Sequence, residues 1–165
     1  MASKPPSPAL SGAAGARFDV ANRLFFRLYQ CANLLHRNGT RAVEDFGSTT
    51  QQWAALGALA RPQARQGGLT VKELMAFLQL SRQNLTIVLD RLEERGVVER
   101  VKDAEDGRSR RVRLTGAGEA LWVAMHEPIE AFYDAALVHL SAAEQQQLVG
   151  LFDKLRAGLM SRNEG

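Results

Sequence analysis

The sequence predicts a mainly α-helical protein with a small β-hairpin, and three observations support this prediction. Residues 70–95 have the apolar spacing and the caps of two short helices joined by a tight turn. Residues 97–114 follow with two strand patterns around an arginine-rich tip. Long stretches with apolar residues at helical spacing lie on both sides of this unit. Two helices followed by a hairpin make a winged helix-turn-helix, here flanked by helices at both ends of the chain.

The composition is that of an ordinary globular protein. The chain has 165 residues, of which 45% are hydrophobic and 24% are charged, and its net charge is only +3. Residues 1–16 are rich in Pro, Ser, Gly and Ala and lack a hydrophobic signal core, so they are expected to form a disordered tail. Since no apolar run is long enough to span a bilayer, we expect a cytoplasmic protein with no membrane partner.

The first predicted helices lie within residues 18–60. Residues 18–37 have a helical apolar face, formed by Leu24, Phe25, Leu28, Cys31, Ala32 and Leu35. Ser48 or Thr49 is expected to cap a second helix. Its apolar stripe consists of Trp53, Leu56, Leu59 and Ala60. Residues 62–68 are predicted to be a loop, because Pro62, Gly67 and Gly68 are poor helix formers.

The helix-turn-helix is predicted from two caps and one apolar stripe. Thr70 and Glu73 match a capping box, which opens a short helix with Leu74, Phe77 and Leu78 directed inward. Ser81 is expected to cap the next helix, residues 82–95. The core face of that helix consists of Leu85, Val88, Leu89 and Leu92. Gly96 stands where a helix end favours a left-handed residue.

A hairpin and two further helical regions complete the prediction. Residues 97–101 and 110–114 are expected to be strands, with a turn at 103–107 between them. Thr115 or Gly116 begins a helical region that Pro128 should kink or restart. Ser141 and Glu144 form a second capping box before the last helix. The side chains expected to face inward there are Leu148, Leu151, Phe152, Leu155 and Leu159.

The terminal helices predict a homodimer. They are apolar and far apart in the sequence, so they cannot belong to the small core of the winged unit, and we expect them to pack together and with copies from a second subunit. The expected organisation is a tail at 1–16, a dimerisation helix and connection at 17–48, a DNA-binding unit at 49–115 and C-terminal dimerisation helices at 116–165. A winged helix-turn-helix places one helix, the recognition helix, in the major groove of DNA. The two recognition helices of such a dimer would then meet two half-sites about 34–36 Å apart.

The face of helix 82–95 opposite its core carries side chains that can read bases. Gln and Asn can bond adenine, Thr and Ile can contact a thymine methyl, and Arg can hold guanine or phosphate. Asp90 and Glu94 would repel phosphates, so contacts should concentrate at the N-terminal half, although Asp90 has the alternative of orienting an arginine of the wing. The plain alternative is a solvated polar face. The predicted DNA-binding residues are Ser81, Arg82, Gln83, Asn84, Thr86, Ile87, Arg91, Arg108 and Arg110.

The hairpin tip gives a second signal for DNA. Residues 108–113 hold four arginines and no acid, and such a cluster can neutralise phosphates. Asp106 and Gly107 are expected to shape the turn so that Arg108 can enter a narrow minor groove. The alternative is an ordinary charged hairpin turn.

Residues 70–120 resemble the core of the MarR family of bacterial transcription regulators. The matching segments are ELM-x-x-L, LSRQNLT, LDRLEERGVVER, the D-x-R of Asp106 and Arg108, and V-x-LT-x-x-G from Val112 to Gly118. The resemblance extends more weakly over most of residues 20–160. The family pattern often has proline at Ala104 and a basic residue at Gly107, so this chain departs from it within the wing.

The resemblance implies an obligate homodimer that often represses transcription from a pseudo-palindromic operator. It places helix 82–95 in the major groove and Arg108 in the minor groove. It also implies release of DNA by a small aromatic carboxylate or related compound, bound between the dimerisation helices and the winged unit. The candidate ligand residues are Arg23, Arg27, His36, Phe46 and Trp53, each of which has the alternative of a core or surface role.

Other functions have weaker support in the sequence. The single cysteine, Cys31, allows a redox-responsive regulator, but it lies on the predicted apolar face, and a buried thiol there would be inert. His126 and Glu130 are a weak start for a metal site, so neither a metal nor a cofactor is expected. An enzyme is not expected, since no catalytic motif is present. A winged domain that binds only proteins remains the alternative from another class.

Overall fold

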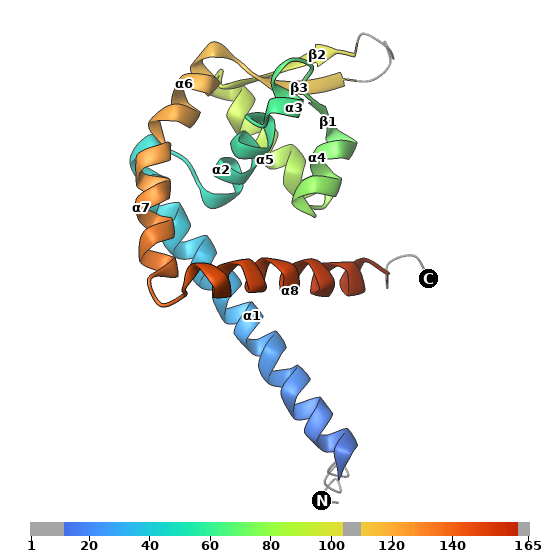
Figure 1. Ribbon diagram of the computed structural model, residues 1–165. Helices are drawn as coiled ribbons and strands as arrows, with labels where there is room; N and C mark the ends of the chain where they lie inside the picture. Colours follow the sequence, from blue (N-terminus) through green and yellow to red (C-terminus); the bar gives the residue numbers. More distant parts are fainter. Residues whose placement is uncertain (1–11, 104–109, 162–165) are drawn as a thin grey trace, which may run out of the picture.

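The protein is described from a computed structural model, which covers residues 12–103 and 110–161. Its winged unit lies at one end, and α1 and α8 cross below it in the view of Figure 1. The mainly helical fold with a winged unit is as predicted. The elements in chain order are α1 (Ala13–Val43), η1 (Glu44–Phe46), α2 (Thr50–Leu59), α3 (Pro62–Arg65), β1 (Leu69–Thr70), α4 (Val71–Leu78), α5 (Arg82–Glu94), β2 (Val98–Lys102), β3 (Arg110–Leu114), α6 (Gly116–Ala124), α7 (His126–Leu137) and α8 (Ala142–Met160).

The hairpin is part of a three-stranded antiparallel sheet with the order β1-β3-β2. In the β2–β3 pair, Val98 lies opposite Leu114 and Lys102 lies opposite Arg110. The two-residue strand β1, which was not predicted from the sequence, pairs with β3 through Leu69 and Val112. Gly68 makes this approach possible, because its φ is +70° and a Cβ there would lie 2.4 Å from the carbonyl oxygen of Val112.

The core of the winged unit is built on the predicted inner face of α5, whose four apolar side chains are all buried. They belong to one buried cluster together with side chains of α2, α4, β2, β3 and the α6–α7 junction. The fully buried large side chains are Leu56, Leu59, Leu74, Leu85, Leu89, Leu92, Met125, Val43, Val98 and Val112. The prediction for Phe77 was wrong: its side chain is 49% exposed, and the guanidinium of Arg61 lies 4.4 Å from its ring centroid.

Side-chain caps fix the starts of the helices. The boxes at Thr70–Glu73 and Ser141–Glu144 form as predicted, and Thr49 forms another with Gln52. The Glu73 carboxylate accepts hydrogen bonds from the backbone N–H and the hydroxyl of Thr70, at 2.7 and 2.8 Å. These bonds favour the ionised form and lower the pKa of Glu73.

Three boundaries differ from the prediction. Helix α1 includes residues 13–16, which were expected in the tail, and continues to Val43 rather than ending at 37. Pro62 stands at the start of α3 inside the expected loop, because a proline at the first helical position loses no hydrogen bond. The restart predicted from Pro128 is present, since α6 ends at Ala124 and α7 begins at His126, which places this proline in the first turn of α7. Within the residues described, every helix is too short or too polar to cross a membrane.

Candidate nucleic-acid interface

Helix α5 presents the predicted base-reading side chains to solvent. The helix starts at Ser81, whose hydroxyl accepts the backbone N–H of Asn84 at 3.2 Å. This cap and the helix N-terminus create a positive end that suits phosphate. The exposed side chains of this half are those of Ser81, Arg82, Gln83, Asn84, Thr86 and Ile87, and no acid is among them.

The C-terminal half of α5 is tied to the sheet through Arg100 of β2. Its guanidinium lies 2.6 Å from the Asp90 carboxylate and also pairs with Glu93. The alternative role of Asp90, orienting an arginine of the hairpin, is therefore confirmed, whereas the part of Glu93 was missed. Because Arg100 is shared by both carboxylates, it offsets part of their negative charge and ties α5 to β2, which supports the half of the helix predicted to read bases.

The arginine-rich hairpin is only partly available for DNA. Arg111 donates to the carbonyl oxygens of Gly67 and Gly68 at 2.8 and 3.1 Å, and to Asp103 at 2.9 Å. Arg113 pairs with Glu99 across the hairpin at 2.7 Å. These two arginines bind groups of their own chain. The expectation that the whole arginine cluster neutralises phosphates is therefore corrected. Arg110 is exposed. The predicted wing residues Asp106, Gly107 and Arg108 lie outside the described residues, as does Ala104.

Known proteins of similar sequence and structure are transcription regulators. The model of the MarR family matches residues 46–109. The transcriptional activatory protein BadR of Rhodopseudomonas palustris is 52% identical, over 78% of this chain and 74% of BadR. The chain belongs to the MarR family. The homoprotocatechuate degradative operon repressor of Escherichia coli is 31% identical, over 74% of this chain and 80% of that protein.

A DNA-bound member of the MarR family has the same architecture. The crystal structure of a cysteine-to-serine variant of MarR from Escherichia coli with operator DNA has a TM-score of 0.73 and 25% identity to this chain. The likeness covers 84% of this chain and 96% of that one. This MarR-family protein is thus a DNA-binding transcription regulator and not an enzyme.

The five candidate ligand residues do not gather in one hollow of this MarR-family chain. Trp53 is a core residue, 7% exposed, with its ring centroid 5.8 Å from that of Phe132 and 5.7 Å from that of Tyr133. Phe46 packs against the core of the winged unit. Arg23, Arg27 and His36 are exposed on α1.

Two apolar hollows lie along α1 instead. The first, of about 560 Å³, lies between α1 and α7 and is lined by Cys31, Leu34, Leu35, Asn38, Phe132, Tyr133, Ala136 and Leu137. Burial raises the pKa of the Tyr133 hydroxyl, which therefore stays a proton donor at neutral pH. The second, of about 370 Å³, lies between α1 and α8 and is lined by Leu24, Arg27, Leu28, Cys31, Leu148, Leu151, Phe152 and Leu155.

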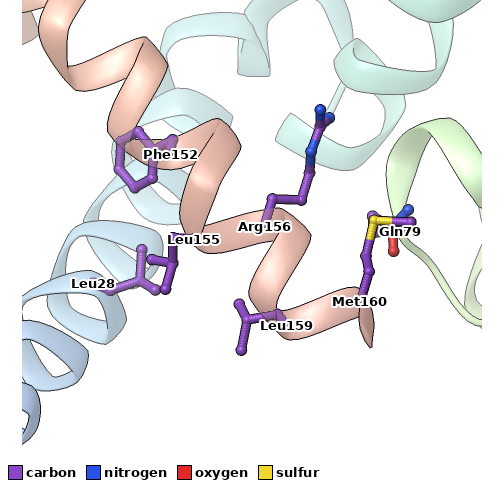
Figure 2. Close-up of a pocket in the computed structure, with 7 residues that line it drawn as sticks. All are labelled: Leu28, Gln79, Phe152, Leu155, Arg156, Leu159 and Met160. Carbon is purple, nitrogen blue, oxygen red and sulfur yellow. The ribbon is translucent and has the colours of Figure 1, made fainter. Parts of the chain in front are cut away.

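Helix α8 leaves most of its apolar face uncovered. Figure 2 shows Phe152, Leu155 and Leu159 along α8, with Leu28 of α1 on one side and Gln79, the residue after α4, on the other. No residue of α8 is buried, so the side chains predicted to face inward find no complete partner within this chain.

Cys31 is exposed within the single chain and lines both hollows, and its expected burial stays a prediction that depends on the dimer. Across residues 12–103 and 110–161, no three His, Cys, Asp or Glu side chains lie close enough to hold a metal ion.

Proposed function

We propose that this MarR-family regulator binds a pseudo-palindromic operator as a homodimer, with α5 of each subunit in the major groove and the wing in the minor groove. The observation that supports this proposal is the capped N-terminal half of α5, whose exposed face carries no acid and whose other half is tied to the sheet by Arg100. We further propose that a small aromatic carboxylate, or a related compound, changes the occupancy of the operator.

The uncovered apolar surface supports the dimer. Of the nineteen large hydrophobic side chains that are exposed among the described residues, fourteen lie on α1 and α8. Soluble monomers rarely expose contiguous apolar patches of this kind, and a two-fold interface buries the same patch on both subunits. A second copy of the chain is therefore the occupant we propose for this surface.

The direction of regulation follows from where the operator lies. Repression was expected from the sequence, yet BadR is named an activator and the Escherichia coli relative a repressor. The same dimer on DNA blocks the polymerase where the operator overlaps the promoter and can assist it from an upstream site. We therefore propose that operator position sets the sign, whereas the residues above set only the affinity.

Replacing Asn84 by Ala should lower affinity for the operator by about 30-fold or more, because each subunit of the dimer loses one base contact and a bidentate contact to a base is worth roughly 1–3 kcal/mol. The slope of log affinity against log salt should stay unchanged. Replacing the exposed Arg110 by Ala is the matched control: we expect weaker binding to every sequence and a salt slope smaller by about 2, because each subunit of the dimer loses one phosphate contact. Both variants should be measured by fluorescence anisotropy on DNA that the wild-type protein selects from a random duplex pool.

If Asn84→Ala and Arg110→Ala both leave binding and its salt dependence unchanged, this face does not read DNA. The alternative that the winged unit binds only proteins would then gain support.

The hollow between α1 and α7 is the site we propose for the effector. Its aromatic wall of Phe132 and Tyr133, backed by Trp53, suits an aromatic ring, and the hydroxyl of Tyr133 and the amide of Asn38 can donate to a carboxylate. Arg27, one turn from Cys31, lines the neighbouring hollow. Of the five predicted ligand residues, Trp53 thus supports this site from behind its aromatic wall, whereas Arg27 lies outside it. Redox sensing through Cys31 stays a prediction.

A thermal-shift screen of aromatic carboxylates tests this site. A compound at about 100 times its Kd should raise the Tm by about 5 °C or more. The rise should disappear in Tyr133→Ala and persist in Val138→Ala, a control because Val138 is exposed directly after α7 and lies outside this hollow. A shift that survives in Tyr133→Ala would place the compound elsewhere, and a compound that binds without changing operator affinity would not be the effector.

A further inference from the structure

We infer that Arg95 is a positioning residue that sets the angle of the recognition helix α5 relative to the long helix α1. This inference rests on the proposed function, because the angle matters when two recognition helices must meet two half-sites at once. Arg95 itself lies at the end of α5 that is remote from the reading half.

The guanidinium of Arg95 binds the segment that follows α1. It donates to the carbonyl oxygen of Phe46 at 2.7 Å, to that of Gly47 at 2.9 Å and to the Ser48 hydroxyl at 3.3 Å. The two carbonyl groups end the short helix η1, where backbone acceptors have no partner within the helix. A planar guanidinium can serve several acceptors at once, which the point charge of a lysine cannot do in the same geometry.

The segment that Arg95 binds is a rigid continuation of α1. Val43, the last residue of α1, is fully buried, and its carbonyl oxygen accepts the backbone N–H of Ser48 at 3.3 Å. Ser48 is only 3% exposed. Gly47 turns the chain with a φ of +60° and donates its N–H to Glu44 at 2.8 Å. A displacement of the end of α1 therefore also displaces the groups that Arg95 binds.

A second attachment holds α1 to α2 rather than to α5. The Thr50 hydroxyl donates to the carbonyl oxygen of His36 at 2.8 Å, and the Thr50 backbone N–H donates to the Thr40 hydroxyl at 3.1 Å. Gly39 lets the helices approach, since a Cβ there would lie 3.1 Å from the Thr50 hydroxyl oxygen. Because this attachment fixes α2, the orientation of α5 against the end of α1 is left to the bonds of Arg95 and to apolar packing.

The bonds of Arg95 lie at one end of α5, and the side chains proposed to read bases lie at the other. Thirteen helical residues span about 20 Å, so a rotation of about 10° at the Arg95 end moves the reading end by about 3 Å. A single half-site tolerates such a movement, because one winged unit can follow its DNA. A full operator does not, since the dimer fixes both recognition helices at one spacing.

The experiment compares two duplexes, both taken from DNA that the wild-type protein selects from a random pool: the full selected site, and the same site with one half scrambled. We expect the wild-type protein to prefer the full site by about 100-fold or more. In Arg95→Met this ratio should fall about tenfold, with half-site affinity and Tm close to wild type. Arg95→Lys should lower the ratio in the same way while keeping the charge and the salt dependence.

Arg113→Met is the matched control, because Arg113 also forms a hydrogen-bonded ion pair in the winged unit but contacts neither α1 nor η1 through it. The ratio of full-site to half-site affinity of Arg113→Met should equal that of the wild-type protein. An unchanged ratio of full-site to half-site affinity in the Arg95 variants would overturn the inference. If both affinities also fall by the same factor, Arg95 only stabilises the fold. A wild-type protein without preference for the full site would instead overturn the proposed dimer on two half-sites.

Discussion

A protein that carries Leu151→Glu together with Phe152→Glu is expected to lose its dimer and to bind operator DNA at least about 100-fold more weakly. Both side chains line the α1–α8 hollow, and they are 52% and 46% exposed within one chain. Charges there cost little in a single subunit, whereas burying four carboxylates in a two-fold apolar interface costs several kcal/mol. The loss of operator affinity follows because the second half-site contact is no longer intramolecular.

Light scattering after size-exclusion chromatography should report a monomeric mass for this double variant, and a gel-shift titration should report its DNA affinity. Val123→Glu is the control, since Val123 is 60% exposed but lies on α6, outside the α1–α8 surface. Some homodimers have no stable folded monomer, so the Tm of the wild-type protein should also rise with its concentration. A double variant that stays dimeric, or a monomer that binds the operator at full strength, would contradict the proposed interface.

The features that the sequence predicted well depend on residues close together in the chain. The caps at Thr70 and Ser141 need only a partner three residues later, and the inner face of α5 repeats with the period of the helix itself. The left-handed Gly96 has the same local origin. For this reason α4, α5, α8 and the hairpin could be placed before any tertiary structure was known.

The features that were missed depend on contacts between distant segments. Arg111 and Arg113 looked equivalent to Arg110 along the chain, yet Arg111 binds the carbonyl oxygens before β1 and Arg113 binds Glu99. The strand β1 exists because Gly68 lets the chain lie against Val112, and no periodicity predicts a strand of two residues. Phe77 has the right spacing for the core, but Leu74 is the residue of α4 that is buried, and the ring of Phe77 packs under the guanidinium of Arg61.

The candidate site also has one part that follows from local sequence and one part that depends on distant contacts. The base-reading half of α5 could be named from one helical wheel, because its exposure follows from the burial of the opposite face. The links that hold the helix could not: Arg100 reaches Asp90 from ten residues away, and Arg95 reaches Phe46 from forty-nine. The position that we propose for α5 in the DNA groove therefore depends on residues that no local pattern singles out.

Gly118→Ala is expected to destabilise the protein by about 3 kcal/mol or more, although alanine normally favours a helix over glycine by roughly 0.5–1 kcal/mol. A Cβ at Gly118 would lie 1.9 Å from the carbonyl oxygen of Val97 and 2.9 Å from its carbonyl carbon. Both atoms belong to the backbone, so no side-chain rotation relieves the overlap. The start of α6 would have to move away, and the bonds from Thr115 to Val97 (3.1 Å) and to Gly96 (2.7 Å) would be lost.

Gly116→Ala provides the control for Gly118→Ala two residues away on the same helix, because nothing lies within 4 Å of a Cβ at Gly116. We expect its Tm to equal or exceed that of the wild type, whereas Gly118→Ala should lower the Tm by about 6–12 °C at equal protein concentration. The bonds at risk join the end of α5 and the start of β2 to α6, so operator binding should fall with the Tm. A Gly118→Ala protein as stable as the wild type would show that α6 can shift without cost, and the close seating of this helix on Val97 would then not be what holds the winged unit to the helices that follow it.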